Sequence, residues 1–104
     1  MRIAIIGIGA MGCLFGAKLS QVAQVTLLGN WPAQLMALGK NGLRFIEPDG
    51  RSQTIHLAAT NNPQLAAPAE LALILVKSHQ TPQAAEIARQ VLSPNGVALT
   101  LQNG

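Results

Sequence analysis

The stretch Ile5-Ile6-Gly7-Ile8-Gly9-Ala10-Met11-Gly12 decides the fold of this chain. It joins a mostly apolar run, Arg2–Ile6, to a segment of small and helix-forming residues that extends to Ser20. Because the run shows no alternation of polar and apolar residues, it predicts a strand buried on both faces, as in a parallel sheet. We therefore expect a strand, a tight glycine-rich turn and then a helix over residues 13–20.

Three glycines of the turn, Gly7, Gly9 and Gly12, follow the pattern GxGxxG. In this pattern the first glycine permits the turn, the second lets the backbone approach a diphosphate, and the third lets the helix lie close to the sheet. Gly16, one helical turn later, extends that close-packed face. The N–H groups and dipole at a helix start favour phosphate charge. The residues predicted to bind a dinucleotide diphosphate are Gly7, Ile8, Gly9, Ala10, Met11 and Gly12. The alternative is a glycine-rich turn that binds nothing.

Strand-like and helix-like segments alternate along the rest of the chain. We predict strands at Gln24–Leu28, 71–76 and 97–101, helices at 31–38 and 82–92, a hairpin of 42–46 and 53–57, a loop at 60–63 and a turn at 94–96. This alternation predicts an α/β fold of the Rossmann type, with a doubly wound, mainly parallel sheet and a small β-hairpin insert. A length of 104 residues indicates one domain, a dinucleotide-binding domain over residues 1–104.

Composition excludes several classes of protein. Apolar residues make up 49% of the chain and charged residues 11%, with a net charge of +3, so we do not expect disorder. The seven basic residues are dispersed and only three residues are aromatic, unlike a nucleic-acid-binding surface. No residues have metal-ligand spacing, so we expect no metal. The mild positive charge favours an anionic cofactor or an acid substrate.

The single cysteine, Cys13, leaves no partner for an internal disulfide and indicates a reducing compartment. It lies just inside the first predicted helix, where we expect it to pack rather than react. No segment approaches the roughly 20 apolar residues that span a bilayer. We therefore predict a cytoplasmic protein with no membrane or nucleic-acid partner.

The residue after the second predicted strand bears on the choice between NAD and NADP. An Asp or Glu about 20 residues after the glycine loop would bond the 2′-hydroxyl of NAD and repel the 2′-phosphate of NADP. Here Asn30 occupies that place, and no acidic residue occurs between Met1 and Leu43. We therefore predict NADP(H) as the cofactor, with Asn30 donating a hydrogen bond to the phosphate. The alternative is that Asn30 is only a turn residue.

Two polar residues follow later strands, at the ends where open α/β sheets bind ligands. Lys77 comes directly after the run 71–76, and Asn103 follows the run 97–101. Lys77 would hold a carboxylate or carbonyl oxygen of a substrate by its charge. Asn103 would bond the cofactor ribose or the substrate. The alternatives are a solvated loop lysine and an ordinary Asn-Gly turn.

Three segments together make a resemblance to a known family specific. They are Ile5-Ile6-Gly7-Ile8-Gly9-Ala10-Met11-Gly12, Leu75-Val76-Lys77-Ser78-His79-Gln80-Thr81 and Leu101-Gln102-Asn103-Gly104. With them the chain resembles, over its whole length, the ketopantoate reductase (2-dehydropantoate 2-reductase) family. The glycine loop alone fits many dehydrogenases, but the pairing of the second and third segments at this separation is far more selective.

The resemblance implies an NADPH-dependent oxidoreductase of pantothenate biosynthesis, which transfers hydride to the keto group of a 2-oxo acid such as 2-dehydropantoate. It assigns Lys77 and Asn103 to the catalytic crevice, where both also contact the cofactor, and gives Gln80 a supporting role beside Lys77. The chain departs from the family at Asn30, where relatives commonly carry Arg.

The resemblance also assigns the general acid to a second, helical domain that is absent from these 104 residues. We therefore expect an N-terminal part of a longer protein that binds cofactor but does not turn over substrate alone, and whose uncovered face permits a homodimer. Two other functions stay open. One is a cofactor-sensing Rossmann module without catalysis, and the other is the cofactor domain of another two-domain hydroxy-acid or imine reductase.

Overall fold

A computed structural model describes residues 1–30, 32–76 and 80–101 of the chain. The strands are β1 (Arg2–Ile6), β2 (Gln24–Leu28), β3 (Leu43–Ile46), β4 (Ser52–Ile55), β5 (Ala58–Thr60), β6 (Ala69–Ile74) and β7 (Leu92–Thr100). The helices are α1 (Ala10–Leu19), α2 (Pro32–Asn41), α3 (Pro63–Ala66) and α4 (Thr81–Val91). Five strands form one sheet in the order β5-β2-β1-β6-β7, and each neighbouring pair is parallel.

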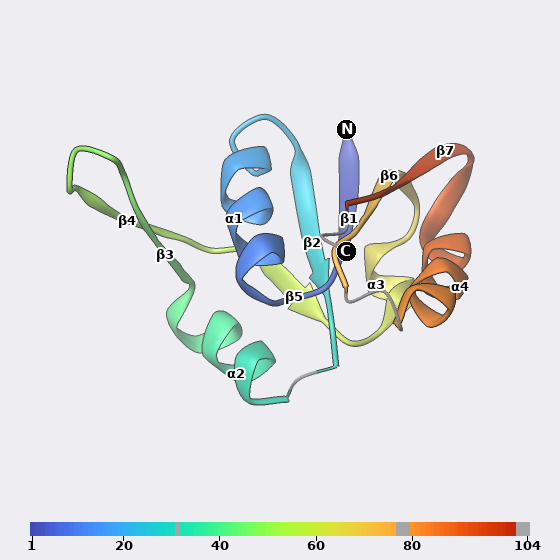
Figure 1. Ribbon diagram of the computed structural model, residues 1–104, viewed down its shortest axis with the longest axis horizontal. Coiled ribbons are helices and arrows are strands. Elements are labelled where there is room, and N and C mark those ends of the chain that lie inside the picture. Colours follow the sequence, from blue (N-terminus) through green and yellow to red (C-terminus); the bar gives the residue numbers. More distant parts are fainter. Residues whose placement is uncertain (31, 77–79, 102–104) are drawn as a thin grey trace.

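The central strand β1 is buried on both faces, which explains its apolar sequence. Ile3 and Ile5 pack in a cluster on the face covered by α1 and α2, with Cys13 and Leu38 among its members. Ala4 and Ile6 pack in the cluster on the opposite face, under α3 and α4. Figure 1 shows α1 and α4 on opposite sides of the sheet. The predicted doubly wound α/β fold is confirmed.

The order of the strands fixes where a ligand can enter. From β1 the chain moves to β2 and β5 on one side, and then to β6 and β7 on the other. The direction of winding therefore reverses between β1 and β6. In open parallel sheets the crevice at such a switch point, outside the carboxyl ends of the strands, is where ligands bind. The glycine loop follows β1 directly at this point.

Two predicted segments near β5 have bounds that differ from the expected ones. Residues 60–63 were expected to be a loop, but the loop is confined to residues 61–62, because β5 ends at Thr60 and α3 begins at Pro63. The carboxamide oxygen of Asn62 accepts a hydrogen bond from the Gln64 N–H at 3.1 Å and so caps α3. The second strand of the hairpin was predicted to end at residue 57 but ends at Ile55. The chain leaves the hairpin there, and the next segment, Ala58–Thr60, pairs with β2.

The turn predicted at 94–96 lies within β7. Ala69 pairs with Leu92 and Leu71 pairs with Val97, so β7 advances five residues where β6 advances two. The Pro-Asn-Gly sequence therefore produces an irregularity in an edge strand and not a separate turn. The first helix also begins earlier than expected, at Ala10 and not at residue 13.

The hairpin of β3 and β4 forms its own two-stranded antiparallel sheet, as predicted. Figure 1 shows it extending beyond α1 and α2, away from the main sheet. Its turn contains Gly50 at φ +90, and the Asp49 carboxylate accepts a hydrogen bond from Arg51 Nε at 2.6 Å. No helix in the described ranges is long and apolar enough to cross a membrane.

Candidate dinucleotide-binding site

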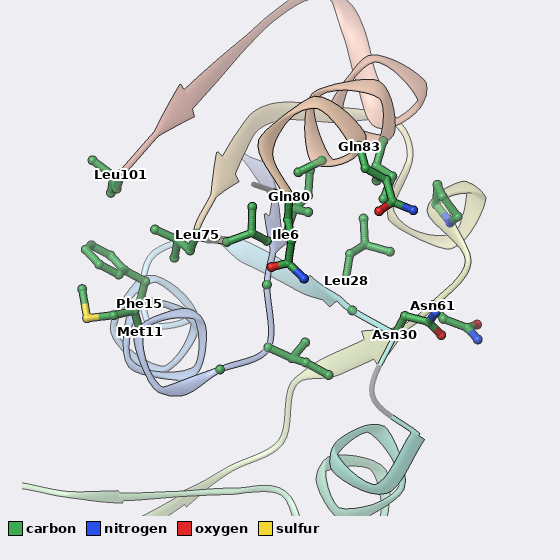
Figure 2. A pocket seen from close by; sticks show the side chains of 18 residues that line it. Ile6, Met11, Phe15, Leu28, Asn30, Asn61, Leu75, Gln80, Gln83 and Leu101 are labelled. Carbon is green, nitrogen blue, oxygen red and sulfur yellow. The ribbon is translucent and has the colours of Figure 1, made fainter. Parts of the chain in front are cut away.

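A cavity of about 1070 Å³ lies at the carboxyl ends of β1, β2 and β6. Its walls come from the glycine loop and the start of α1, the ends of β2, β6 and β7, the segment after β5, and the start of α4. Figure 2 shows Met11, Phe15 and Leu101 at one end, with Asn30 and Asn61 at the other. The cavity is therefore elongated, with apolar side chains at one end and carboxamides at the other.

The glycine loop has the geometry that its spacing predicts. Gly7 adopts φ +125, and a Cβ added there would lie 2.5 Å from the Leu75 carbonyl oxygen. The Gly7 N–H donates to the Leu28 carbonyl oxygen at 2.8 Å, which ties the loop to the end of β2. A Cβ on Gly12 would overlap the Gly7 carbonyl oxygen. The turn and the close helix-to-strand approach are thus confirmed.

Gly16 and Gly9 differ in what surrounds them. A Cβ on Gly16 would lie 3.0 Å from side-chain atoms of both Leu27 and Leu57, so this position continues the close-packed face as expected. A Cβ on Gly9 would meet nothing within 4 Å, although Gly9 lines the cavity. The backbone at Gly9 is therefore accessible from the cavity, with no protein atom in the way. That is the feature a diphosphate needs for close approach.

Helix α1 begins at this loop with its first N–H groups available. Gly9 is the N-cap in extended conformation and provides no side-chain cap, and the first turn contains no acidic residue. The first intrahelical bond runs from the Cys13 N–H to the Gly9 carbonyl oxygen at 3.0 Å. The preceding N–H groups have no intrahelical acceptor, and the helix dipole adds partial positive charge there. Gly9 and Met11 bring this helix start to the cavity.

Of the two asparagines at the carboxamide end of the cavity, one was predicted from the sequence and the other was not. Asn30, a predicted site residue, is exposed and lines the cavity after β2. Asn61, which follows β5, lies beside it in Figure 2 and was not predicted. The two segments are joined because the Gly29 N–H donates to the Thr60 carbonyl oxygen at 3.1 Å. A polar residue directly after a parallel strand is the sequence signal that would have indicated Asn61. It was missed because β5 was not predicted as a strand.

The wall opposite the glycine loop comes from α4 and the end of β6. Gln80 and Gln83 supply carboxamides, and Ala84 and Ile87 supply apolar surface. Figure 2 shows the Gln80 side chain extending into the space between Ile6 and Leu28. None of the four acidic residues of the chain lines the cavity.

Lys77 and Asn103 lie outside the described residues. Their described neighbours Val76, Gln80 and Leu101 all line the cavity. Of the predicted diphosphate-binding residues, Gly7, Ile8, Gly9 and Met11 line it directly. Gly12 supports the loop from behind through its contact with Gly7.

A family model described as "Ketopantoate reductase PanE/ApbA" matches residues 3–104. The 2-dehydropantoate 2-reductase of Halobacterium salinarum is 36% identical over 106 residues, and that of Streptococcus pyogenes serotype M1 is 30% identical over 105 residues. Each match covers 100% of this chain and 34% of the relative. The chain thus spans about a third of the length of the curated relatives it matches.

Solved structures agree in fold. The PanE/ApbA family ketopantoate reductase from Ralstonia eutropha superposes with a TM-score of 0.88 at 32% identity, covering 100% of this chain and 35% of that one. A ternary structure of D-mandelate dehydrogenase with NADH and anilino(oxo)acetate superposes with a TM-score of 0.85 at 26% identity, covering 100% and 34%. The class of cofactor that goes with this family is a nicotinamide dinucleotide, NAD(P)H.

Proposed function

This chain belongs to the ketopantoate reductase family, and from that premise we propose that residues 1–104 are the NADP(H)-binding domain of a 2-oxo-acid reductase. The observation that carries the proposal is the glycine loop at the switch point of the sheet, where Gly9 faces the cavity over open space. A diphosphate lying along this loop would meet main-chain N–H groups at the start of α1. When bound, the nicotinamide supplies the hydride for reduction.

The direction of the cofactor follows from the polarity of the two ends of the cavity. Asn30 and Asn61 offer carboxamide donors to the ribose that carries the 2′-phosphate. Met11, Phe15 and Leu101 offer an apolar surface to the uncharged nicotinamide half at the other end. With the cofactor in this orientation, the substrate would meet the nicotinamide beside Leu101. Asn103 follows Leu101 by two residues in the sequence.

The preference for NADP(H) over NAD(H) is supported by the absence of carboxylates. The acidic residues are Glu47, Asp49, Glu70 and Glu86, and none of them lines the cavity. A 2′-phosphate would therefore meet no like charge, and an NAD ribose would find no carboxylate to bond its 2′-hydroxyl. The net charge of +3 adds a weak general attraction for the more anionic cofactor.

Lys77 and Asn103 are the residues we propose for the reaction itself. The family resemblance assigns them to the catalytic crevice, and each follows a described residue that lines the cavity, Val76 and Leu101. Lys77 would hold a carboxylate or carbonyl oxygen of the 2-oxo acid, and Asn103 would bond cofactor and substrate. Turnover is proposed for the whole protein, whose second, helical domain would supply the general acid.

A second candidate is an NADH-dependent hydroxy-acid dehydrogenase. It is favoured by one observation, namely that no described residue lining the cavity carries a positive charge that would pair with a 2′-phosphate. The structural neighbour that holds NADH, D-mandelate dehydrogenase, is an enzyme of that kind. The two candidates share the glycine loop and differ at the carboxamide end.

Titration of the chain with NADPH and with NADH, followed by nicotinamide fluorescence, tests the proposal. We expect NADPH to bind at least about fivefold more tightly, which corresponds to one additional net hydrogen bond. Competition by adenosine 2′,5′-diphosphate and by 5′-AMP isolates the contribution of the 2′-phosphate. Equal affinities would contradict the preference for NADP(H), tighter binding of NADH would support the second candidate, and no binding of either dinucleotide would contradict both.

A further inference from the structure

The carbonyl oxygen of Ile8, in the middle of the glycine loop, accepts hydrogen bonds from two side chains. The Cys13 thiol of α1 donates to it at 3.5 Å, and the Gln34 carboxamide Nε2 of α2 donates to it at 3.5 Å. The same nitrogen also donates to the Cys13 sulfur at 3.7 Å. The thiol is buried and the carboxamide is half-buried. Two helices thus converge on a single peptide group.

This peptide group separates the packed side of the loop from the cavity side. Ile8 and Gly9 line the cavity, whereas Cys13 and Gln34 do not. The peptide between Ile8 and Gly9 is trans, so its carbonyl and its N–H point in opposite directions. Holding the carbonyl toward α1 and α2 therefore turns the Gly9 N–H away from them. No hydrogen bond joins that N–H to another described residue.

We propose that Gln34 is a positioning residue for the diphosphate, acting through the Ile8–Gly9 peptide. Its carboxamide fixes the carbonyl on the packed side, and this aims the Gly9 N–H at the phosphate oxygens. This inference rests on the proposed function, because it concerns how the same cavity binds its dinucleotide. Gln34 never touches the cofactor in this arrangement, and its effect is the same for NADPH and NADH because both carry the same diphosphate.

Gln34 is the stronger of the two donors. A carboxamide N–H is a full hydrogen-bond donor, whereas a thiol is a weak one. Gln34 also links distant parts of the chain, since it lies 26 residues from Ile8 in a helix that starts two residues after Asn30. Helix α2 is therefore connected both to the glycine loop, through Gln34, and to the carboxamide end of the cavity, through the chain that follows Asn30. Loss of this one side chain frees the peptide to rotate without removing any group that contacts cofactor.

The test compares Gln34→Met with Gln90→Met in the same chain. Methionine keeps the length of the side chain but removes the donor, and Gln90 is exposed on α4 and does not line the cavity. We expect Gln34→Met to raise the Kd for NADPH and for NADH by the same factor, about threefold to tenfold, as for loss of one net hydrogen bond. Gln90→Met should leave both values unchanged.

A second readout is the backbone amide signal of Gly9 in ¹H–¹⁵N spectra of the ligand-free chain. Gln34→Met should shift this signal, and Gln90→Met should not. Cys13→Ala should shift it in the same direction by less, which covers the case in which Gln34→Met fails to fold. An unchanged Gly9 signal together with control-like Kd values would overturn the inference. If wild-type chain binds neither dinucleotide, the proposed function fails, and a shifted Gly9 signal still establishes the positioning of the peptide.

Discussion

Gly12 lies so close to Gly7 that a Cβ added to Gly12 would overlap the Gly7 carbonyl oxygen. The contact is between two backbones, one at the end of β1 and one in the first turn of α1. Neither a rotamer change nor a side-chain shift can relieve it. This contact sets how closely the helix start approaches the strand, and hence where the N–H groups of α1 lie relative to the cavity.

We therefore predict that Gly12→Ala destabilises the chain by about 3 kcal/mol or more, at the upper end of overpacking costs. Urea denaturation followed by circular dichroism measures this. Gly39→Ala is the matched control, because a Cβ at this position in α2 meets nothing within 4 Å. It should stabilise the helix by about 0.5–1 kcal/mol. A loss below about 1 kcal/mol for Gly12→Ala would mean that the helix can move away from the strand at little cost.

Gly9→Ala should separate binding from stability. The residue has φ −75 and ψ −169, which alanine adopts without strain, and the added Cβ meets no protein atom within 4 Å. The folding free energy should therefore stay within about 0.5 kcal/mol of wild type, as for substitutions away from structural features. The methyl group would occupy the space over the loop, so the Kd values for NADPH and NADH should both rise at least about tenfold. Fluorescence titration measures this, and unchanged affinity would place the diphosphate elsewhere.

Asn30→Asp should change the cofactor preference. A carboxylate at the end of β2 would bond the 2′-hydroxyl of NAD and repel a 2′-phosphate. We expect the Kd for NADPH to rise at least about tenfold and that for NADH to fall, because only the ribose of NADH gains a hydrogen bond. Asn41→Asp, on the exposed end of α2, adds the same charge outside the cavity and should alter neither value. Equal losses for the two dinucleotides would show that Asn30 does not face the ribose.

Asn61 and Asn62 provide a matched pair of neighbours with different roles. Asn61 lines the cavity, whereas the side chain of Asn62 caps α3 through the Gln64 N–H. Asn61→Ala should weaken NADPH binding about threefold, as for one net hydrogen bond, and leave stability unchanged. Asn62→Ala should cost about 1 kcal/mol of stability and leave binding unchanged. Thermal unfolding and fluorescence titration of both variants measure the contrast, and a stability loss in Asn61→Ala alone would reverse the assignment.

The glycine loop and the three long buried strands were predictable because each depends on local sequence. Arg2–Ile6 and Gln24–Leu28 have the bounds that their apolar runs predict, whereas the third strand, predicted at 71–76, begins and ends two residues earlier, at Ala69–Ile74. The glycine roles also follow from spacing, since a tight turn and a close helix approach need particular residues at fixed positions. The existence of the cavity at this edge of the sheet then follows from the alternation of strands and helices.

The parts that failed depend on tertiary pairing. Ala58–Thr60 has only three small or polar residues and no apolar run, so nothing in its own sequence marks it as a strand. It becomes one because the edge of β2, from Thr26 to Leu28, offers hydrogen-bonding partners to the segment Ala58–Thr60. Asn61 was missed for that reason. The far wall, with Gln83 and Ile87, needed the packing of α4 against β6, which no local pattern specifies.

The hydrogen bonds from Gly7 to Leu28 and from Gly29 to Thr60 join three strand ends through main chain alone. At the carboxamide end of the cavity, by contrast, the contacts to the ribose come from the side chains of Asn30 and Asn61 in our proposal. How tightly a dinucleotide is held and which dinucleotide is preferred are consequently encoded in separate parts of the molecule. The cofactor preference can thus be redesigned by substituting Asn30 and Asn61, without changing the glycine loop that binds the diphosphate.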